Sequence, residues 1–249
     1  MTIQMKGNRP KVTVVTVVRN APAALKTTAE SVLSQTYADI EYVIVDGAST
    51  DGTADYARSL GDRVDVLISE RDNGIYDAMN KGVRAASGEW VIFMNAGDIF
   101  YAPDTVERVF GTDDYAGFGV VYGDVAKKNA SGEPVVKKAG APHNSHRMFF
   151  CHQSAFYRRD ELLATPFDTA HRMSADIHQV KRLWKKGVRF RQLDIPVAIF
   201  DTGGVSNVKR SAGLRDNISV VCELDGLVDR LRLLPKLYVP YLMCRLRGK

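Results

Sequence analysis

The chain has 249 residues, of which 45% are hydrophobic and 25% charged, and this composition is that of a globular protein rather than a disordered or fibrous one. It contains no run of about 18 uninterrupted apolar residues, which argues against a membrane-spanning helix. We expect no secretory signal before the first strand. The three cysteines, Cys151, Cys222 and Cys244, are far apart and predict neither a metal clip nor a disulfide framework.

The net charge of +5 is concentrated at the C-terminus. Residues 227–249 hold six basic side chains and one acidic one, so residues 1–226 carry 28 charges of each sign and are neutral. A basic tail on a neutral domain is not the pattern of a nucleic-acid-binding surface, and we expect no nucleic acid partner.

The first hundred residues alternate between β-branched runs and amphipathic segments. Strands are expected at 11–18, 41–45, 64–69 and 90–94, and helices are expected from Pro22, from about Thr53 and from Ile75. This alternation predicts an α/β protein with three layers and a parallel central sheet.

The second half of the chain predicts antiparallel additions to this sheet. Strands are expected at 120–126, 134–138, 148–157, 188–193 and 197–200. A helix is expected from Ser174 to about Gly187, with Ile177, Val180, Leu183 and Trp184 on its inner face. We expect one domain over residues 1–210, with a nucleotide-binding half at about 11–100, an acceptor half at about 101–210, and a helical tail at 211–249.

Polar side chains follow each of the first four predicted strands. Asn20 follows the first strand, Asp46 ends the second, and the segments 70–72 and 95–98 follow the third and fourth. Ligands of open α/β sheets bind beyond the carboxyl ends of the strands. The four ends together therefore predict a polar-rimmed nucleotide site.

The segments VTVVRN, VDGASTDGT and RDNGIYDAMNKGVRAASGEWVIFMNAGD, in this order, resemble the nucleotide-sugar-binding half of family-2 glycosyltransferases. These are inverting enzymes with the GT-A fold, and the stretch NGIYDAMNKG most resembles the subgroup that extends bacterial surface polysaccharides. The resemblance covers about residues 11–205. It implies a three-layer GT-A fold with a mixed, mostly parallel central sheet.

The resemblance implies that Asp46 reads the nucleotide base, because a carboxylate is a suitable acceptor for a ring N–H. It also implies that Asn80 and Lys81 contact the ribose or the diphosphate. The alternatives are a helix cap for Asp46 and a solvated surface position for Lys81. The other nucleotide-binding positions that it implies are Thr16, Val18, Asn20, Ser49, Asn73, Asn95, Ala96 and Gly97.

The segment Asn95–Asp98 aligns with the acidic metal motif of the family, but only Asp98 retains a carboxylate. Mg²⁺ commonly keeps water and needs only one or two protein carboxylates, so Asp98 can hold Mg²⁺ or Mn²⁺ on a diphosphate. His152 resembles a family position that supports the metal or positions the acceptor. The alternative for His152 is a structural role in the core.

Asp176 matches the family base, which takes a proton from the acceptor hydroxyl. Its position in the first turn of a helix favours the ionised form, and helix stabilisation alone is the structural alternative. Gln153 is expected beside His152 in the acceptor region. Gly203 and Gly204 match a segment that folds over the donor, where glycines let backbone N–H groups approach a diphosphate.

The tail at residues 227–249 is both apolar and basic, and Pro235 and Pro240 are expected to break any single long helix. Such a segment can lie in the membrane interface, drawn by anionic lipids at about 1 kcal/mol per basic residue. The alternative is packing of its apolar side on the domain or on a second subunit. We expect a cytoplasmic protein, peripheral on the inner face of the cell membrane.

The predicted activity is inverting transfer of a hexose from a nucleotide sugar, most plausibly a UDP-sugar, to a hydroxyl of a polyprenyl-diphosphate-linked glycan. One alternative is a nucleotidyltransferase, but the Arg19–Pro22 segment lacks the glycine-rich phosphate loop that such an enzyme needs. The other is a non-catalytic binding protein, favoured only by the reduced acidic motif.

Overall fold

The computed structural model describes residues 9–128, 132–201 and 210–246. Its strands are β1 (Val12–Val18), β2 (Ile40–Asp46), β3 (Val66–Ser69), β4 (Trp90–Phe93), β5 (Ile99–Phe100), β6 (Val120–Lys128), β7 (Pro134–Lys137), β8 (Ala155–Arg158) and β9 (Phe190–Phe200). Its helices are α1 (Pro22–Leu33), α2 (Thr53–Ser59), α3 (Ile75–Ala85), α4 (Thr105–Phe110), α5 (Arg159–Ala164), α6 (Ala175–Lys185), α8 (Arg210–Leu224), α9 (Leu227–Leu233) and α10 (Pro235–Leu246). These elements confirm the α/β class and the strand and helix order expected for the first hundred residues.

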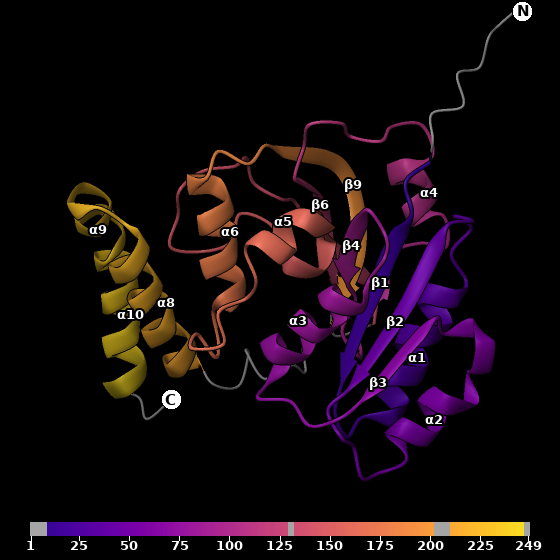
Figure 1. Ribbon diagram of the computed structural model, residues 1–249. Coiled ribbons are helices and arrows are strands. Elements are labelled where there is room, and N and C mark those ends of the chain that lie inside the picture. Colours follow the sequence, from indigo (N-terminus) through magenta and orange to yellow (C-terminus); the bar gives the residue numbers. More distant parts are fainter. Residues whose placement is uncertain (1–8, 129–131, 202–209, 247–249) are drawn as a thin grey trace, which may run out of the picture.

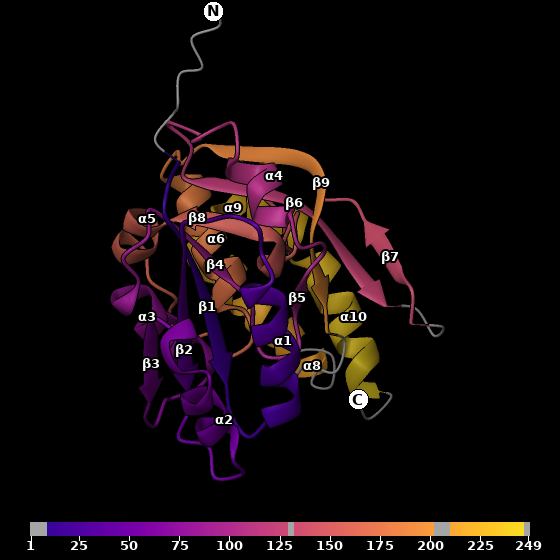
Figure 2. The ribbon, with the colours of Figure 1, turned by 90° about the vertical axis from the view of Figure 1, so that its right-hand side faces the viewer.

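The described strands form one mixed sheet in the order β3-β2-β1-β4-β8-β6-β9-β5, with β7 paired to β6. β1 to β4 run parallel to one another, while β8 is antiparallel to both β4 and β6. β6 and β9 are again parallel, and β5 and β7 are antiparallel additions. Figure 2 shows β7 projecting from the rest of the sheet.

Hydrophobic cores lie on both faces of the sheet, which explains the continuous apolar run of β1. Side chains of α1, α2 and α4 pack on one face, and those of α3, α5 and α6 pack on the other. Figure 1 shows these two helical layers with the strands between them. Residues alternate along β1, so that Val14 enters one core and Val15 the other.

Three corrections to the expected elements concern the second half of the chain. Only residues 155–157 of the expected 148–157 strand are extended, as part of β8, because a 3-10 turn occupies 152–154. The expected strands 188–193 and 197–200 are one strand, which runs through Pro196 where its pairing with β6 is irregular. Trp184 is not on the inner face of α6, since 37% of it is exposed.

The C-terminal helices α8, α9 and α10 share a small apolar cluster of their own. They lie beside α6, on the side away from β1–β3 (Figure 1). Pro235 separates α9 from α10 as expected, but Pro240 lies inside α10 and does not end it. Among the described residues, no helix is both long and apolar enough to cross a membrane.

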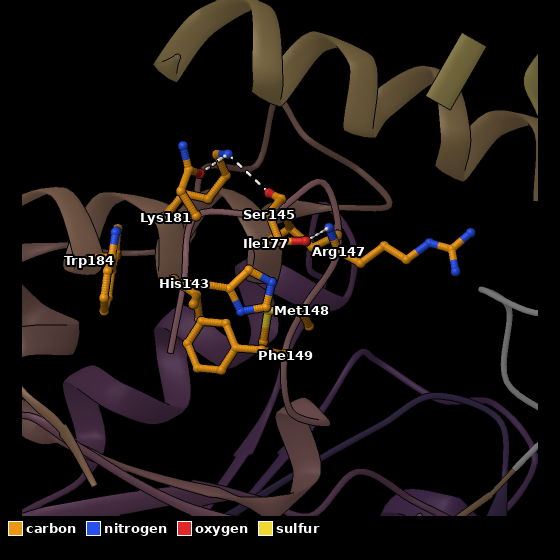
Figure 3. Close-up of a pocket in the computed structure, with 10 residues that line it drawn as sticks. His143, Ser145, Arg147, Met148, Phe149, Ile177, Lys181 and Trp184 are labelled. Carbon is orange, nitrogen blue, oxygen red and sulfur yellow. Dashed lines mark hydrogen bonds between the residues drawn. The ribbon is translucent and has the colours of Figure 1, made fainter. Parts of the chain in front are cut away.

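A buried ion pair joins these helices to the sheet domain. The ammonium of Lys181 on α6 lies 2.6 Å from the carboxylate of Asp225, which follows α8, and both side chains are almost fully buried. Lys181 also donates to the side-chain oxygen of Asn144 at 2.6 Å and to the carbonyl of Ser145 at 3.1 Å. Figure 3 shows Lys181 reaching this segment beside a small pocket. The tail is thus fastened to α6 by polar groups.

A second buried carboxylate, that of Glu41 on β2, ties β1 and β2 to the turn before β4. It accepts hydrogen bonds from the Thr13 hydroxyl at 2.6 Å and from the backbone N–H of Ser87 at 2.7 Å. Burial alone would raise its pKa, but the hydrogen bonds from Ser87 and Thr13 and the charge of Lys11 lower the pKa to about 2. The ionised form therefore stabilises the fold.

Glu41→Gln is expected to reduce the free energy of unfolding at pH 7 by about 3–4 kcal/mol, at about 1.4 kcal/mol per pKa unit. Because the pKa of Glu41 is lower in the folded chain, this contribution is present above pH 4.5 and is lost as the pH falls towards about 2. Urea unfolding at pH 7 and at about pH 3 measures it. Glu30→Gln, at an exposed site, is the control and should change stability by less than about 0.5 kcal/mol. An equal loss for Glu41→Gln at both pH values would contradict the argument.

Candidate active site

A cleft of about 1190 Å³ opens beyond the carboxyl ends of β1 and β4. Its walls come from the β3–α3 loop, the first turn of α3, β6, β7, residues 148–153, the start of α6 and the end of β9. Five basic and five acidic side chains line it: Arg19, Lys127, Lys137, Lys138 and Arg172, and Asp72, Asp77, Asp98, Asp176 and Asp201. A cleft with both signs of charge can hold a diphosphate and a cation together.

The turn after β4 brings two carboxylates together. Gly97 has a φ of 103°, and a Cβ there would lie 2.7 Å from the Asp201 carboxylate, so this close turn requires glycine. The backbone N–H of Asp201 donates to Asp98 at 2.8 Å. Burial raises the pKa of Asp98 to about 7, although the hydrogen bonds from Asp201 and Gln153 act to lower it. Asp201 thus supplies a second acid that the motif after β4 lacks.

The residues around Asp98 fit a divalent cation shared with a diphosphate. Two buried polar atoms there, Asn95 Oδ1 and His152 Nε2, have no hydrogen-bond partner among the described residues. Asp98 and His152 both line the cleft, although they do not form a tight cluster of three protein ligands. Such an ion would take its remaining oxygens from the diphosphate and from water.

His152 is buried between aromatic rings and is neutral. Its imidazole stacks on Phe93 at 5.0 Å, and its Nδ1 lies 3.2 Å from the Tyr157 hydroxyl. Burial lowers its pKa to about 3. The side chain therefore offers a neutral nitrogen to the cleft and carries no proton to donate as an imidazolium at neutral pH.

Asp176 lies in the first turn of α6 and lines the same cleft. Burial raises the pKa of its carboxylate, and a hydrogen bond from the Tyr76 hydroxyl, at 3.1 Å, partly opposes the rise. Tyr76 stacks on Phe167 at 5.6 Å between ring centroids. A half-buried carboxylate in a fixed orientation is suited to proton abstraction.

Asn80 and Lys81 both hold loops at the edge of the cleft. The Asn80 amide donates to the Phe167 carbonyl at 2.8 Å and accepts from the Phe167 N–H at 3.0 Å. Lys81 donates to the carbonyl of Arg71 at 2.6 Å and pairs with Glu70 at 2.8 Å. Neither side chain is among those that line the cleft, and their contacts with ribose or diphosphate stay a prediction.

Asp46 also lies outside the lining of the cleft and is fully buried. It accepts from the Ser69 hydroxyl at 2.7 Å and from the N–H of Ser49 at 3.2 Å. The carboxylate of Asp72 packs over Gly47, the residue that follows Asp46, and Asp72 lines the cleft where Asp46 does not. At this end of the cleft the surface acid is Asp72, and Asp46 supports the loop beneath it.

Of the other positions predicted to bind the nucleotide, Val18, Asn73, Asn95 and Ala96 line the cleft. Thr16 is buried and donates to the Met94 carbonyl at 2.8 Å, and Asn20 and Ser49 join the loops that follow β1 and β2. Gln153 lines the cleft beside His152, while Gly203 and Gly204 lie outside the described residues.

Sequence reasoning missed Arg19, Tyr76 and Arg172 as residues of the cleft, although Arg19 was visible at a strand end. Asp72 lies in the segment 70–72 that was expected at the nucleotide site, and Asp201 begins the segment that was expected to fold over the donor. No local sequence pattern points to Tyr76, because its role depends on a contact with Asp176, 100 positions later in the chain.

The described fold, with a cleft that holds both signs of charge at the carboxyl ends of its parallel strands, defines the class of GT-A glycosyltransferases. The family model "Glycosyl transferase family 2" matches residues 13–176, and the chain belongs to this family. A "PGL/p-HBAD biosynthesis glycosyltransferase" of Mycobacterium bovis is 34% identical over 201 residues, covering 76% of each chain. A putative teichuronic acid biosynthesis glycosyltransferase of Bacillus subtilis is 36% identical over 97 residues, or 38% of each chain.

Two solved structures share the fold. A mannosyltransferase of Pyrobaculum calidifontis, in complex with GDP-Man and Mn²⁺, has a TM-score of 0.66 and 20% identity. The match covers 86% of this chain but only 64% of that one. S. aureus TarS, in complex with UDP-GlcNAc, has a TM-score of 0.67 and 18% identity over 87% of this chain and 68% of that one. The expected GT-A fold is confirmed.

Tyr76→Phe is expected to lower kcat for glycosyl transfer about tenfold, because it removes one hydrogen bond to a charged carboxylate. The KM for the donor should stay within about twofold, since the ring still stacks on Phe167. Steady-state kinetics with a nucleotide-release assay measures both constants. Tyr238→Phe, in the exposed tail, is the control. A loss confined to KM would argue against positioning of Asp176 by Tyr76.

Proposed function

We propose that the protein transfers a hexose from a UDP-sugar to a hydroxyl of a lipid-linked glycan, with inversion at the sugar carbon. The observation that carries the proposal is the presence of Asp98 and Asp176 in the walls of one cleft. The relatives support a role in glycoconjugate assembly, since one is named for PGL/p-HBAD biosynthesis and another for teichuronic acid biosynthesis.

The donor nucleotide is proposed to lie at the end of the cleft formed by Val17–Arg19 and Asp72. There the Asp72 carboxylate accepts the base N–H, supported by the Asp46 loop beneath it, and Arg19 faces the phosphates. A UDP-sugar is favoured over a GDP-sugar by the family subgroup and by TarS, whose structure holds UDP-GlcNAc. The mannosyltransferase, which holds GDP-Man, is the counter-example.

Asp98, with Asp201 and the His152 nitrogen nearby, is proposed to hold Mg²⁺ or Mn²⁺ against the diphosphate. When bound, the ion neutralises the charge that develops on the leaving nucleoside diphosphate. Arg172 and Lys127 add positive charge to the same cleft. The Mn²⁺ complex of the mannosyltransferase supports this assignment.

Asp176 is proposed as the general base. The acceptor hydroxyl approaches the sugar from the face opposite the leaving diphosphate, and Asp176 takes its proton as the new bond forms. Burial raises the pKa of this carboxylate, which makes it a better proton acceptor than an exposed aspartate. The hydroxyl of Tyr76 holds one carboxylate oxygen, so the other is directed to the acceptor.

The acceptor is proposed to be presented at an anionic membrane surface, with the tail in the interface. Large apolar side chains of α9 and α10 are exposed: Leu227, Val228, Leu231, Tyr238, Val239, Leu242, Met243 and Leu246. Exposed basic residues, among them Arg232, Lys236 and Arg245, accompany them. This combination favours a cytoplasmic enzyme, peripheral on the inner face of the membrane.

Asp176→Asn is expected to lower kcat by about 10²–10⁴-fold, the usual contribution of a general base. The donor Kd should change less than about threefold, because Asp176 acts on the acceptor. Nucleotide release and calorimetric titration of the donor with Mn²⁺ measure the two effects. Asp160→Asn, exposed on α5 and outside the cleft lining, is the matched control for activity. Equal losses of donor affinity and of kcat in Asp176→Asn would remove it from this role.

The triple change Val228→Ser, Leu231→Ser and Leu242→Ser is expected to weaken binding to vesicles with anionic lipid at least about tenfold, because it removes exposed apolar area and spares the buried cluster. Vesicle sedimentation measures binding, and high salt should weaken it in the unmodified protein. Leu163→Ser, an exposed leucine on α5, is the control. Unchanged sedimentation of the triple variant would contradict membrane contact through the tail.

A further inference from the structure

Two histidines and two carboxylates meet behind the active site, where the C-terminal helices join the sheet domain. They are Asp168 and His171 in the segment before α6, His178 on α6 and Glu223 on α8. One possible ligand atom from each of the four lies within 4.8 Å of all the others. None of the four lines the described cleft, so this cluster is separate from the site around Asp98.

Both imidazoles face one carboxylate. His171 Nε2 lies 3.0 Å from one oxygen of Glu223, and His178 Nε2 lies 3.0 Å from the other. The ring centroids of the two histidines are 4.6 Å apart. Imidazole nitrogens with carboxylate oxygens are a donor set that suits zinc and similar divalent transition metals.

A third carboxylate already orients one of the two rings. Asp216 on α8 lies 2.9 Å from His171 Nδ1, which leaves the Nε2 of this ring to face the cluster. Metal-binding histidines are commonly held by a carboxylate on the second ring nitrogen in this way. Asp216 also accepts the backbone N–H of Met173 at 2.7 Å, which fixes the segment that carries His171.

The groups of the cluster do not satisfy all of its hydrogen-bonding atoms. His178 is 1% exposed, and its Nδ1 has no hydrogen-bond partner among the described residues. Three carboxylates, those of Asp168, Asp216 and Glu223, surround the two imidazoles, and a divalent cation balances the excess of negative charge in this group. Glu223 is about half exposed, which gives an ion a route from solvent.

We propose that Asp168, His171, His178 and Glu223 bind one zinc ion in a four-coordinate structural site. Zinc–ligand bonds of about 2.0–2.2 Å place tetrahedral ligand atoms about 3.3–3.6 Å apart, which is close to the 3.0 Å between each imidazole Nε2 and Glu223 and within the 4.8 Å that encloses all four atoms. The ion joins α8 to α6 and to the preceding segment. It thereby stiffens Met173 and Asp176, which line the cleft, without contacting substrate.

The test is zinc binding by the full chain, loaded with Zn²⁺, dialysed against metal-free buffer and analysed for metal by mass spectrometry. One zinc per chain is expected, with a rise in Tm of about 5–10 °C over the metal-free protein. Cobalt in its place should give the ligand-field absorption bands of a four-coordinate site. Absence of retained zinc in the unmodified chain would overturn the proposal.

Glu223→Gln and His178→Gln should each lose the bound zinc and the rise in Tm. The exposed His143→Gln is the matched control and should retain both. Asp98→Asn should also retain both, which separates this site from the metal proposed in the cleft. Glu223 is half exposed, so its variant is expected to fold even where His178→Gln does not. Full zinc retention by Glu223→Gln would show that the ion binds elsewhere and would contradict the assignment.

Discussion

The two hydrogen bonds between the Asn80 amide and the backbone of Phe167 are the contact on which the rest of the cleft depends. They fix the segment between α5 and α6 on α3. Phe167 then stacks on Tyr76, and Tyr76 holds Asp176. An amide that pairs with a backbone N–H and C=O, as a neighbouring strand would, thus sets the direction of the proposed base. The orientation of Asp176 is therefore a property of the junction between α3 and α6 and not of either helix alone.

Polar residues at strand ends proved to have two kinds of role. Asp98 and Asn73 line the cleft, whereas Asp46 is buried and Lys81 is bound to the loop after β3. Both kinds follow from the same need, since a loop that binds a ligand must itself be held by satisfied hydrogen bonds. A sequence position at the end of a strand marks the neighbourhood of a site. Which of the side chains there faces the cleft depends on tertiary packing, and the spacing of residues in the sequence gives no information about that packing.

The α/β order, the strand boundaries within two residues for β1 to β4, and the placement of Asp98 and Asp176 were predictable, because buried strands and helix starts leave local patterns. The single strand through Pro196 was not, since the irregular pairing with β6 that accommodates it is tertiary. Tyr76 and Asp201 gained their roles from partners about 100 positions away. The cluster of His171, His178 and Glu223 is likewise assembled from separate segments and has no motif spacing.

The family match ends at residue 176, before the helices that carry the tail. Those helices have their own apolar cluster, and the contacts that fasten them to α6 include an ion pair and a histidine–carboxylate group. The side chains of α9 and α10 belong to neither of the two cores that flank the sheet and do not line the cleft. The outer surface of these two helices can therefore change in sequence while the groups around Asp98 and Asp176 keep their places.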